Sequence, residues 1–538
     1  MIEAYAVTDV RAVEDLARAE LPDDELMQRA ARGLAEVVLA RFVDPEGDAA
    51  GSVVALVGSG DNGGDALYAT VLLAQAGVSV AAITSGRDDD DAVDLAREVG
   101  VVVVRAEEGS PEGDRAEDER AAGVVGTDID WRDLLAEASV VIDGLLGIGG
   151  RPGLRAPARA LVDAVPADAW LVAVDLPSGA DPAGEQVADD LVIADETVTF
   201  SLVKPVHLLP ASEPAVGRLT VVDIGLDDAV QRNGVRPVVE RLTFDDVADL
   251  WPVPDASSDK YSRGVVGIVA GSVAYPGAAV LSVLGALGAG PGMIRYLGPR
   301  DVRWLVHQAA PEVVTAPGRV QAWVIGSGFD VSSGPDESEA AEESDGSDEA
   351  HEQREWALAA LASDLPVLVD AGALELVDRR DAPTLLTPHA GELARLLTRL
   401  EVSVGGDGRV RDGAPGVEVT REQVTRAPLA HARAAARRTG CTVLLKGATT
   451  LVVDPDPSAP VRSQRDAPAW VATAGAGDVL GGLCGTLLAA GLAPRDAGSL
   501  GALVHGVAAD RASGGGPLRI RDVAREVGPA VRALLTRP

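Results

Sequence analysis

At 538 residues the chain is too long for one hydrophobic core, which indicates two or more domains. Its formal net charge of −36 would repel nucleic acid, so no DNA or RNA partner is expected. There is no apolar run of about 18 residues and no basic segment followed by an apolar one at the start, so neither a membrane span nor a secretory signal is expected. Only Cys441 and Cys484 are cysteines, which favours a reducing cytoplasm.

The order of predicted elements indicates α/β architecture. A helical opening at 7–19 and 22–39 precedes short, continuous, β-branched runs, most of them separated by stretches of helical period. This alternation predicts parallel sheets with helices on both faces. The first series of runs is 53–57, 140–142, 171–174 and 219–222, and the second is 265–270, 322–325, 366–369, 442–445 and 450–453.

The two series meet in a poorly patterned, proline-containing stretch. We therefore predict a first domain at 1–228, a linker at 229–258 and a second domain at 259–538. Acidic stretches at 85–130 and 331–352, and a glycine-rich stretch at 405–416, are expected to be mobile surface loops.

A glycine-rich turn after the first strand predicts a nucleotide site. Glycine lets the backbone approach phosphate, and the helix that follows offers free N–H groups. The Asn-Gly-Gly-Asp core differs from the dinucleotide fingerprint of dehydrogenases, so hydride transfer is disfavoured. The motif consists of Asp61, Asn62, Gly63, Gly64 and Asp65.

Two later strand ends carry related signals. Asp143 ends one run and precedes a glycine-rich loop, and Asp175 ends the next run in the string Asp-Leu-Pro-Ser178-Gly. Ligands of open parallel sheets bind beyond the carboxyl ends of strands, so these loops are expected to converge on one crevice. The loop after Asp143 comprises Gly147, Ile148, Gly149, Gly150, Arg151, Pro152 and Gly153.

With these motifs the first half resembles the epimerase domain of the NAD(P)H-hydrate repair family, which has a Rossmann-like fold. The resemblance implies that residues 61–65 and 147–153 bind the hydrated dinucleotide. It implies a potassium ion on Asn62, Asp143 and Ser178, and Asp175 as the acid/base. Lys204, one of only three lysines, matches a family position without an assigned role. Asp61 replaces the usual Asn, and Ala66 replaces the usual Gly.

The second half carries a stronger motif, Gly475-Ala476-Gly477-Asp478, before a long helix of small residues. Successive backbone N–H groups at such a turn neutralise charge on a phosphoryl group in flight. Asp478 is placed to take a proton from an attacking hydroxyl. Gly-Ala-Gly-Asp is typical of the ribokinase-like fold, so phosphoryl chemistry is predicted.

The second half is similar to the ADP-dependent dehydratase domain of the same family. The resemblance implies that Ala278, Gly328, His389 and Asp478 contact the hydrated substrate. It implies that the adenine nucleotide is held by Lys446, Gly447, Ala448, Thr449, Thr450 and Gly477.

The implied reaction consumes ADP, with magnesium as a further cofactor. Asp478 would deprotonate the C6 hydroxyl of the hydrated ring, which attacks the β-phosphorus of ADP; phosphate then leaves C6, giving NADH or NADPH and AMP. The implied partners are small molecules, NADH and NADPH hydrates and ADP, and we expect a homo-oligomer. Ala476 stands where the family usually has Thr, and Gly372 replaces the second Asp of a string begun by Asp370.

Two alternatives remain open from the sequence. The first is a ribokinase-like kinase of a small hydroxylated metabolite, fused to a nucleotide-sensing module; the Gly-Ala-Gly-Asp loop allows it. The second is a binding or scaffold role for the first half with its catalysis lapsed. The retained Asp143, Asp175 and Ser178 count against that role, because a lapsed site tends to lose its charged groups.

Overall fold

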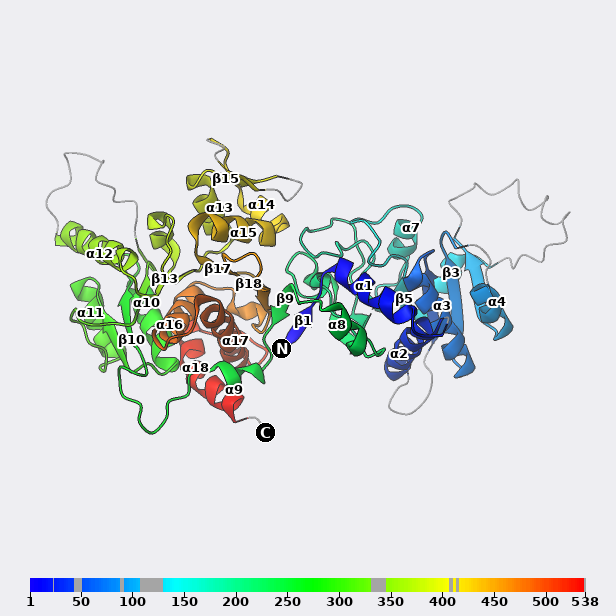
Figure 1. The fold of residues 1–538 in the computed structure, drawn as a ribbon, viewed down its shortest axis with the longest axis horizontal. Coiled ribbons are helices and arrows are strands. Elements are labelled where there is room, and N and C mark those ends of the chain that lie inside the picture. The colour runs from blue at the N-terminus through cyan, green and yellow to red at the C-terminus, as the bar shows by residue number, and fades with distance from the viewer. Residues whose placement is uncertain are drawn as a thin grey trace. The chain divides into compact units, whose positions relative to one another are not determined.

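The computed structural model describes residues 1–22, 24–42, 51–87, 91–106, 129–329, 345–405, 410–412 and 416–536 (Figure 1). The chain folds into two compact units. One comprises Glu3–Val238, and the other comprises Met1–Ile2 together with Val239–Pro538. No helix within the described ranges has the length and apolarity needed to cross a membrane.

The N-terminal unit is built on a seven-stranded sheet in the order β4-β3-β2-β5-β6-β7-β8, with every pair parallel. The chain runs outward from β2 to one edge and then returns to the other side at β5. Such a reversal places a binding crevice beyond the carboxyl ends of β2 and β5. The strands are β2 (Ser52–Val57), β3 (Val80–Thr84), β4 (Val102–Arg105), β5 (Ala138–Gly144), β6 (Trp170–Val174), β7 (Glu196–Phe200) and β8 (Arg218–Val222).

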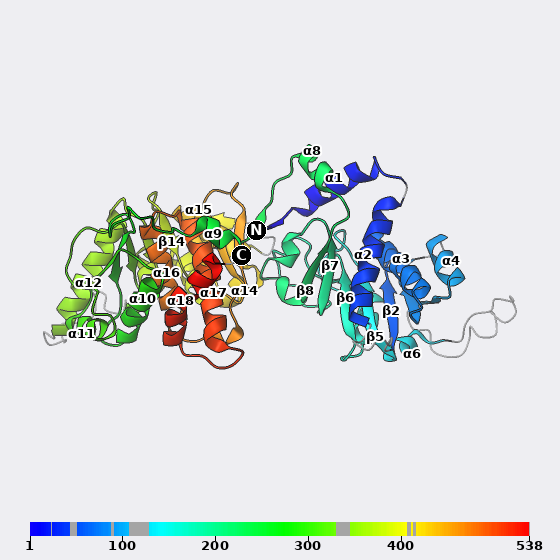
Figure 2. The ribbon, with the colours of Figure 1, turned by 90° about the horizontal axis from the view of Figure 1, so that it is seen from below.

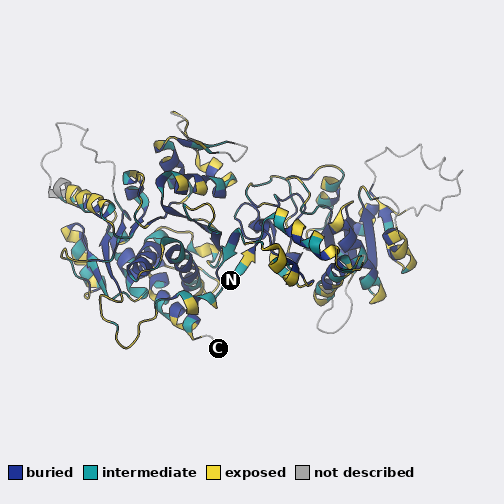
Figure 3. Ribbon diagram, viewed as in Figure 1, coloured by how far each residue is buried: buried dark blue, intermediate teal, exposed yellow. Residues whose placement is uncertain are grey.

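Both faces of this sheet are buried, as Figure 3 shows by the dark strands. Val53 and Ala55 pack into the core on the α2 and α3 side, while Val54 and Leu56 pack into the core on the other side. Figure 2 shows α2 and α3 in front of the sheet. The helices are α1 (Val7–Arg18), α2 (Glu25–Phe42), α3 (Asp61–Gln75), α4 (Asp91–Glu98), α6 (Trp131–Ala136), α7 (Ala158–Asp163) and α8 (Asp227–Asn233), with 3-10 turns η1 (Pro205–His207) and η2 (Glu213–Ala215).

The C-terminal unit contains a ten-stranded sheet in the order β1-β9-β19-β18-β17-β14-β13-β12-β10-β11. The strands from β11 to β17 are parallel, whereas β17, β18 and β19 are antiparallel. The strands are β1 (Ile2–Ala4), β9 (Val239–Arg241), β10 (Val265–Val269), β11 (Met293–Tyr296), β12 (Ala322–Ile325), β13 (Val367–Val369), β14 (Thr384–Leu386), β17 (Thr442–Leu445), β18 (Thr450–Val453) and β19 (Val461–Gln464); a separate hairpin pairs β15 (Val402–Val404) with β16 (Val410–Asp412).

Helices α10, α16, α17 and α18 share one large core with β10 and β12. The contact between α10 and α16 is close, because Cβ atoms added at Gly285 and Gly482 would lie 2.3 Å and 1.9 Å from backbone oxygens of the opposite helix. The helices are α9 (Asp246–Leu250), α10 (Pro276–Gly288), α11 (Arg300–Ala309), α12 (Asp345–Ala362), α13 (Ala390–Arg399), α14 (Arg421–Arg426), α15 (Pro428–Thr439), α16 (Ala476–Ala489), α17 (Pro494–Ser513) and α18 (Ile520–Leu535), with 3-10 turns η3 (Ala371–Leu376) and η4 (Ala469–Val471).

The predicted α/β class is confirmed, and all nine predicted runs are strands: β2, β5, β6, β8, β10, β12, β13, β17 and β18. The expectation of purely parallel sheets is wrong at β17 and β18. Only residues 446–449 separate these strands, and a parallel connection needs a crossover of about a dozen residues.

The boundary region differs from the expected linker at 229–258. Residues from Val239 onward fold with the C-terminal unit, because β9 pairs with β19, and Leu242, Val247 and Trp251 are buried in its core.

Parts of the stretches expected to be mobile loops are ordered, and there the expectation is wrong. Within 85–130, α4 buries Ala92, Val93 and Ala96, and β4 joins the sheet. Residues 345–352 lie in α12, and β16 within 405–416 pairs with β15. The remaining parts of the three stretches at 88–90, 107–128, 330–344, 406–409 and 413–415 lie outside the described residues.

Candidate active sites

In the N-terminal unit, the three predicted potassium ligands meet at the ends of β5 and β6 and the start of α3. The Ser178 hydroxyl and backbone N–H donate to the two Asp143 carboxylate oxygens at 2.7 and 2.8 Å. The Asn62 amide donates to the carbonyls of Val174 at 2.6 Å and Leu146 at 3.3 Å. The Leu146 backbone N–H also donates to the Ser178 hydroxyl at 2.8 Å.

The surroundings of Asp143 fit a monovalent cation. Its side chain is fully buried, and burial raises its pKa although Ser178 and Leu145 donate hydrogen bonds to it. Within the described ranges no Lys or Arg forms an ion pair with it. One carboxylate with amide and hydroxyl oxygens is a hard, weakly charged donor set. No group of three or more His, Cys, Asp or Glu side chains among the described residues could hold a metal ion.

The glycine-rich loops pack tightly around these side chains. A Cβ at Gly63 would lie 2.0 Å from the Gly58 carbonyl oxygen, and one at Gly147 would lie 2.4 Å from the Asn62 amide oxygen. Gly153 donates its N–H to the Gly179 carbonyl at 2.8 Å, which joins the 147–153 loop to the Ser178 turn. The structure thus brings the 61–65 and 147–153 motifs together, while Arg151 and Pro152 are exposed at the loop surface.

Asp175 lies beside this cluster in a left-handed backbone conformation, with φ of 66°. The Lys204 ammonium donates to its carboxylate at 2.6 Å, and the Thr199 hydroxyl donates to the same oxygen at 2.9 Å. The Lys204 side chain is 1% exposed, so Lys204 and Asp175 form an ion pair in the protein interior. The sequence left the role of Lys204 open; the structure places it directly on the predicted acid/base.

His207 fixes the backbone of this pair. Its Nδ1 accepts from the Lys204 backbone N–H at 3.0 Å, so the ring proton is on Nε2, which donates to the Asp175 carbonyl at 2.7 Å. Burial, reinforced by the Lys204 charge, lowers the pKa of His207 to about 4, and the ring is neutral at neutral pH.

A cavity of about 440 Å³ opens beside the start of α3, and the charge of Asp175 acts on two of its lining residues, Asp65 and Glu14. Glu14 from α1, Asp61 and Asp65 from α3, and Phe200 at the end of β7 are among its lining residues. Burial raises the pKa of Asp65 well above its usual range, and the neighbouring charge of Asp175 adds to the rise. Burial also raises the pKa of Glu14. Glu14 could not be selected from the sequence, because it lies on α1, which carries none of the motifs.

In the C-terminal unit, Asp478 lies in the first turn of α16 near a second aspartate–lysine pair. Lys446 donates to Asp370 at 2.7 Å, and the hydroxyls of Thr387 and Ser327 donate to the same carboxylate at 2.9 and 3.1 Å. Asp370 was not selected from the sequence as a site residue. The signal for it was present, since it directly follows the buried strand β13.

The charges of this group are strongly coupled. Burial, and then the negative charge of Asp370, raise the pKa of Asp478 to about 7. Burial alone would raise the pKa of Asp370, but Lys446 and the donated hydrogen bonds outweigh it and hold it below its usual value. A carboxyl poised near neutral pH is suited to act as a general base.

The glycine-rich turn lies against the same lysine. Gly475 has φ of 94°, which favours glycine, and begins α16. A Cβ at Gly477 would lie 3.2 Å from the Lys446 ammonium. Lys446 directly follows β17. It begins a turn that continues through Gly447, Ala448 and Thr449 to Thr450, the first residue of β18. The predicted nucleotide residues therefore share one edge of the sheet.

The predicted substrate contacts lie on the adjacent side. A Cβ at Gly328 would lie 2.7 Å from Ala278 Cβ, so these two residues are neighbours. His389 forms a parallel bridge with Lys446 and caps α13, its Nδ1 accepting from the N–H groups of Gly391 and Glu392. Burial lowers the pKa of His389.

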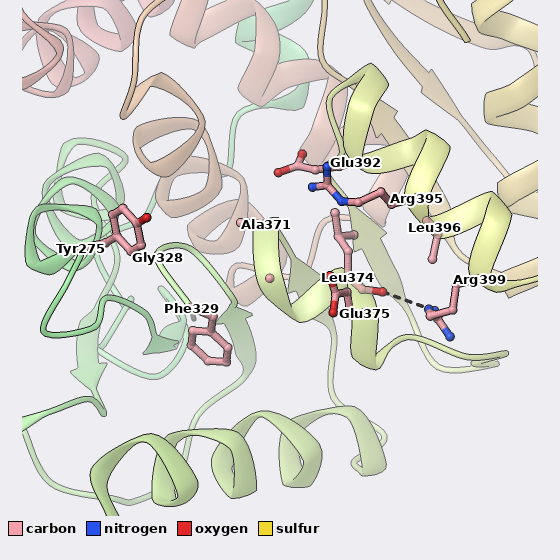
Figure 4. Close-up of a pocket in the computed structure, with 11 residues that line it drawn as sticks. Tyr275, Gly328, Phe329, Ala371, Leu374, Glu375, Glu392, Arg395, Leu396 and Arg399 are labelled. Atoms are coloured by element: carbon pink, nitrogen blue, oxygen red, sulfur yellow. Dashed lines mark hydrogen bonds between the residues drawn. The ribbon is translucent and has the colours of Figure 1, made fainter. Parts of the chain in front are cut away.

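A second cavity of about 430 Å³ lies on this side, between α13 and the loops after β12 and β13 (Figure 4). Figure 4 shows Tyr275 and Phe329 on one flank and Arg395 and Arg399 from α13 on the other. Gly328 and Glu392 also line it, which connects the cavity with the predicted substrate contacts.

Two α/β units, one with a parallel sheet and one with a mixed sheet, each hold an aspartate beside a lysine after a parallel strand, and together they define a two-domain α/β enzyme. Residues 23–206 match the family model of the YjeF-related protein N-terminus, and residues 266–515 match that of NAD(P)H-hydrate dehydratase. The chain belongs to the family of bifunctional NAD(P)H-hydrate repair enzymes, because it matches curated members at more than 30% identity over nearly its full length.

The similar proteins include two mycobacterial members. The bifunctional NAD(P)H-hydrate repair enzyme of Mycobacterium leprae is 38% identical over 519 residues, covering 94% of this chain and 93% of that protein. The Mycobacterium tuberculosis enzyme is 39% identical over 509 residues, which cover 92% of this chain and 90% of that protein. A solved structure of the ADP/ATP-dependent NAD(P)H-hydrate dehydratase from Bacillus subtilis aligns with 54% of this chain and 97% of its own, at 23% identity and a TM-score of 0.42.

Proposed function

We propose that this protein repairs hydrated NADH and NADPH. The N-terminal unit interconverts the R and S hydrates, and the C-terminal unit dehydrates the S hydrate at the expense of ADP. The observation that carries this proposal is Asp478, a carboxyl with a pKa of about 7 at the start of α16, beside the Lys446–Asp370 pair. Family membership supports the combination of both activities in one chain.

For dehydration, Asp478 takes the proton of the C6 hydroxyl, whose oxygen forms a bond to the β-phosphorus of ADP while AMP leaves. The phosphate then leaves C6, and loss of the C5 proton restores the ring double bond. Lys446 and the N–H groups of the 475–478 turn face the phosphates and stabilise their growing charge. Ala278, Gly328 and His389 position the hydrated ring beside Asp478.

Magnesium would neutralise charge on the nucleotide phosphates. Because the described residues offer no group of three acidic, His or Cys ligands, such an ion would be held chiefly by phosphate oxygens and water. The carboxylates of Asp478 and Asp370 lie 3.9 Å from Cβ atoms added at Gly475 and Gly477.

For epimerisation, Asp175 acts as the acid/base, and Lys204 keeps its carboxylate in place. Asn62, Asp143 and Ser178 hold potassium, whose charge would compensate the buried carboxylate and attract the phosphates of the substrate. Residues 61–65 and 147–153 bind the rest of the dinucleotide. Cys441 and Cys484 are buried free thiols, in keeping with a reducing, cytoplasmic setting.

The test is to incubate the protein with separate R and S hydrates, ADP, magnesium and potassium, and to follow the near-ultraviolet absorbance of the dihydronicotinamide. Recovery from both epimers with release of AMP and phosphate is expected. Recovery from the S hydrate alone would contradict the epimerase assignment. No recovery from either would contradict the proposal and favour a kinase of another hydroxylated metabolite.

A further inference from the structure

The N-terminal cavity is acidic at the place where the phosphates of a dinucleotide were expected. Glu14, Asp24, Asp61 and Asp65 all line it, and Arg18 is its one basic lining residue among the described residues. Arg18 is already engaged, with its guanidinium 3.0 Å from Asp61 and 3.9 Å from Glu14. A wall of this charge disfavours phosphate and favours a group that becomes positive.

Asp65 is the most informative residue of this wall. It is only 8% exposed, yet it lines the cavity, and its carboxyl has no hydrogen bond or ion pair with any other described residue. A buried carboxyl without a partner costs free energy, so its retention beside a cavity points to a ligand.

Three further carboxyls act on Asp65: those of Asp175, Asp61 and Glu14. The charge of Asp175, which is paired with Lys204, reaches both Asp65 and Glu14. The charges of Asp61 and Glu14 also raise the pKa of Asp65, whereas Arg18 lowers it, and the Glu14 side chain is 19% exposed. Burial and the neighbouring carboxylates raise the pKa of both Asp65 and Glu14, which favours their protonated forms.

Resting on the proposed epimerase activity, we propose that this cavity holds the hydrated ring and that Asp65 is the acid that expels its C6 hydroxyl. Asp65 donates a proton to that oxygen, the C6–O bond breaks, and water leaves with the bonding pair. The N1 lone pair forms an N1=C6 double bond, which leaves the ring as an iminium cation. Water then adds to the opposite face of C6 while Asp175 accepts a proton from it, giving the other epimer.

The acidic wall has a direct role in this reaction. It stabilises the cation formed between loss and return of water, an electrostatic effect that is strong in a partly enclosed site. Glu14 touches the cavity and carries protons between solvent and Asp65, which resets the pair after each turnover. In the reverse direction Asp175 donates and Asp65 accepts.

The first experiment uses the full chain and the R hydrate in water enriched in the heavy oxygen isotope, without ADP so that dehydration is off. Mass spectrometry of the S hydrate is expected to show one solvent oxygen per inversion, above the rate without enzyme. Inversion with the original oxygen retained would overturn the inference, because it requires ring opening at the N1–C6 bond. That outcome leaves epimerase activity intact, whereas no inversion at all would contradict the proposed function itself.

The second experiment compares Asp65→Asn with Asp168→Asn. Loss of a general acid is expected to lower kcat for inversion by about 10²-fold or more with KM little changed. Asp168 belongs to the same unit but is exposed and does not line the cavity, so its variant is a charge-matched control with an expected unchanged rate. Full activity of Asp65→Asn, or equal losses in both variants, would overturn the assignment. Calorimetric unfolding of the N-terminal unit reports that each variant is folded.

Discussion

Lysine occurs at three positions in this chain, and two of them form ion pairs with an aspartate that follows a parallel strand. Lys204 pairs with Asp175 after β6, and Lys446 pairs with Asp370 after β13. In each case hydroxyl groups of Thr or Ser complete the carboxylate's hydrogen bonds. Both units therefore use a lysine to hold a negative charge at the carboxyl end of a parallel strand.

Replacing Lys204 by Met would leave the Asp175 carboxylate buried without its cation. Removing one partner of a buried pair costs about 3–5 kcal/mol, so the N-terminal unit is expected to unfold at a lower temperature and to lose epimerisation. Calorimetry and the inversion assay measure both effects. Lys260→Met, at an exposed lysine, is the matched control. Wild-type stability of Lys204→Met would contradict the role of the pair.

Replacing Asp370 by Asn is predicted to shift the pH dependence of dehydration. Asp478 must be ionised to accept a proton, so the rate rises with pH around its pKa of about 7. Burial remains in the variant, but the repulsion from Asp370 is gone and Lys446 attracts Asp478 more strongly. The rise in kcat is therefore expected at lower pH. A pH profile that keeps its midpoint while the rate falls would contradict this coupling.

Among single residues, the sequence identified those that stand in a motif and missed those that only folding brings to the site. Asp175, Asp478 and Lys446 stand in recognisable strings; the structure places Asp175 and Lys446 directly after strands and Asp478 in the first turn of α16. Glu14 reaches the N-terminal cavity from a helix with no motif of its own. Ser327 and Thr387 both donate to Asp370, a contact between separate loops that spacing along the chain does not reveal.

Among the elements, the contact between α10 and α16 controls where Asp478 lies. A Cβ at Gly482 would lie 1.9 Å from the Ser282 carbonyl, so Gly482→Ala must push the helices apart and cost about 1–3 kcal/mol. We expect lower stability and a lower kcat for dehydration, since α16 carries Asp478 in its first turn. Denaturant unfolding and steady-state kinetics measure these effects.

The neighbouring glycine supplies the control for this prediction. A Cβ at Gly481 would be 3.6 Å from its nearest neighbour, an ordinary contact, and Ala is favoured over Gly in a helix by about 1 kcal/mol. Gly481→Ala is therefore expected to keep or gain stability. If the two variants behave alike, helix contact does not set the geometry of the site.

The elements predicted from sequence are those with a continuous apolar run. Strands β7 and β19 were missed because buried polar residues interrupt their pattern: Glu196 pairs with Arg41, and Ser463 accepts a hydrogen bond from Arg241. Helix α4 was missed because its acidic side faces solvent and only Ala92, Val93 and Ala96 are buried. In these elements polar side chains hid the pattern, because their partners or their exposure to solvent are evident only in the folded structure.

For the whole molecule, the position of the boundary predicts which fragments fold. A fragment of 239–538 retains β9 and α9, whereas one of 259–538 loses Leu242, Val247 and Trp251, which are 2%, 0% and 8% exposed. Each buried apolar side chain contributes about 1.5–3 kcal/mol, so their loss approaches the total stability of a domain. The longer fragment is expected to fold and dehydrate the S hydrate. Equal melting temperatures for both fragments would contradict this boundary.

The distribution of lysine also determines how the protein responds to covalent labelling. Lys260 is the exposed lysine, Lys204 is sealed in the interior, and Lys446 is partly covered beside the nucleotide turn. An amine-directed acylating reagent therefore has one freely accessible side-chain target, and slower labelling reports on Lys446. Bound ADP should shield Lys446 and leave Lys260 reactive, so mass spectrometry of two peptides measures occupancy of the nucleotide site without any hydrated substrate.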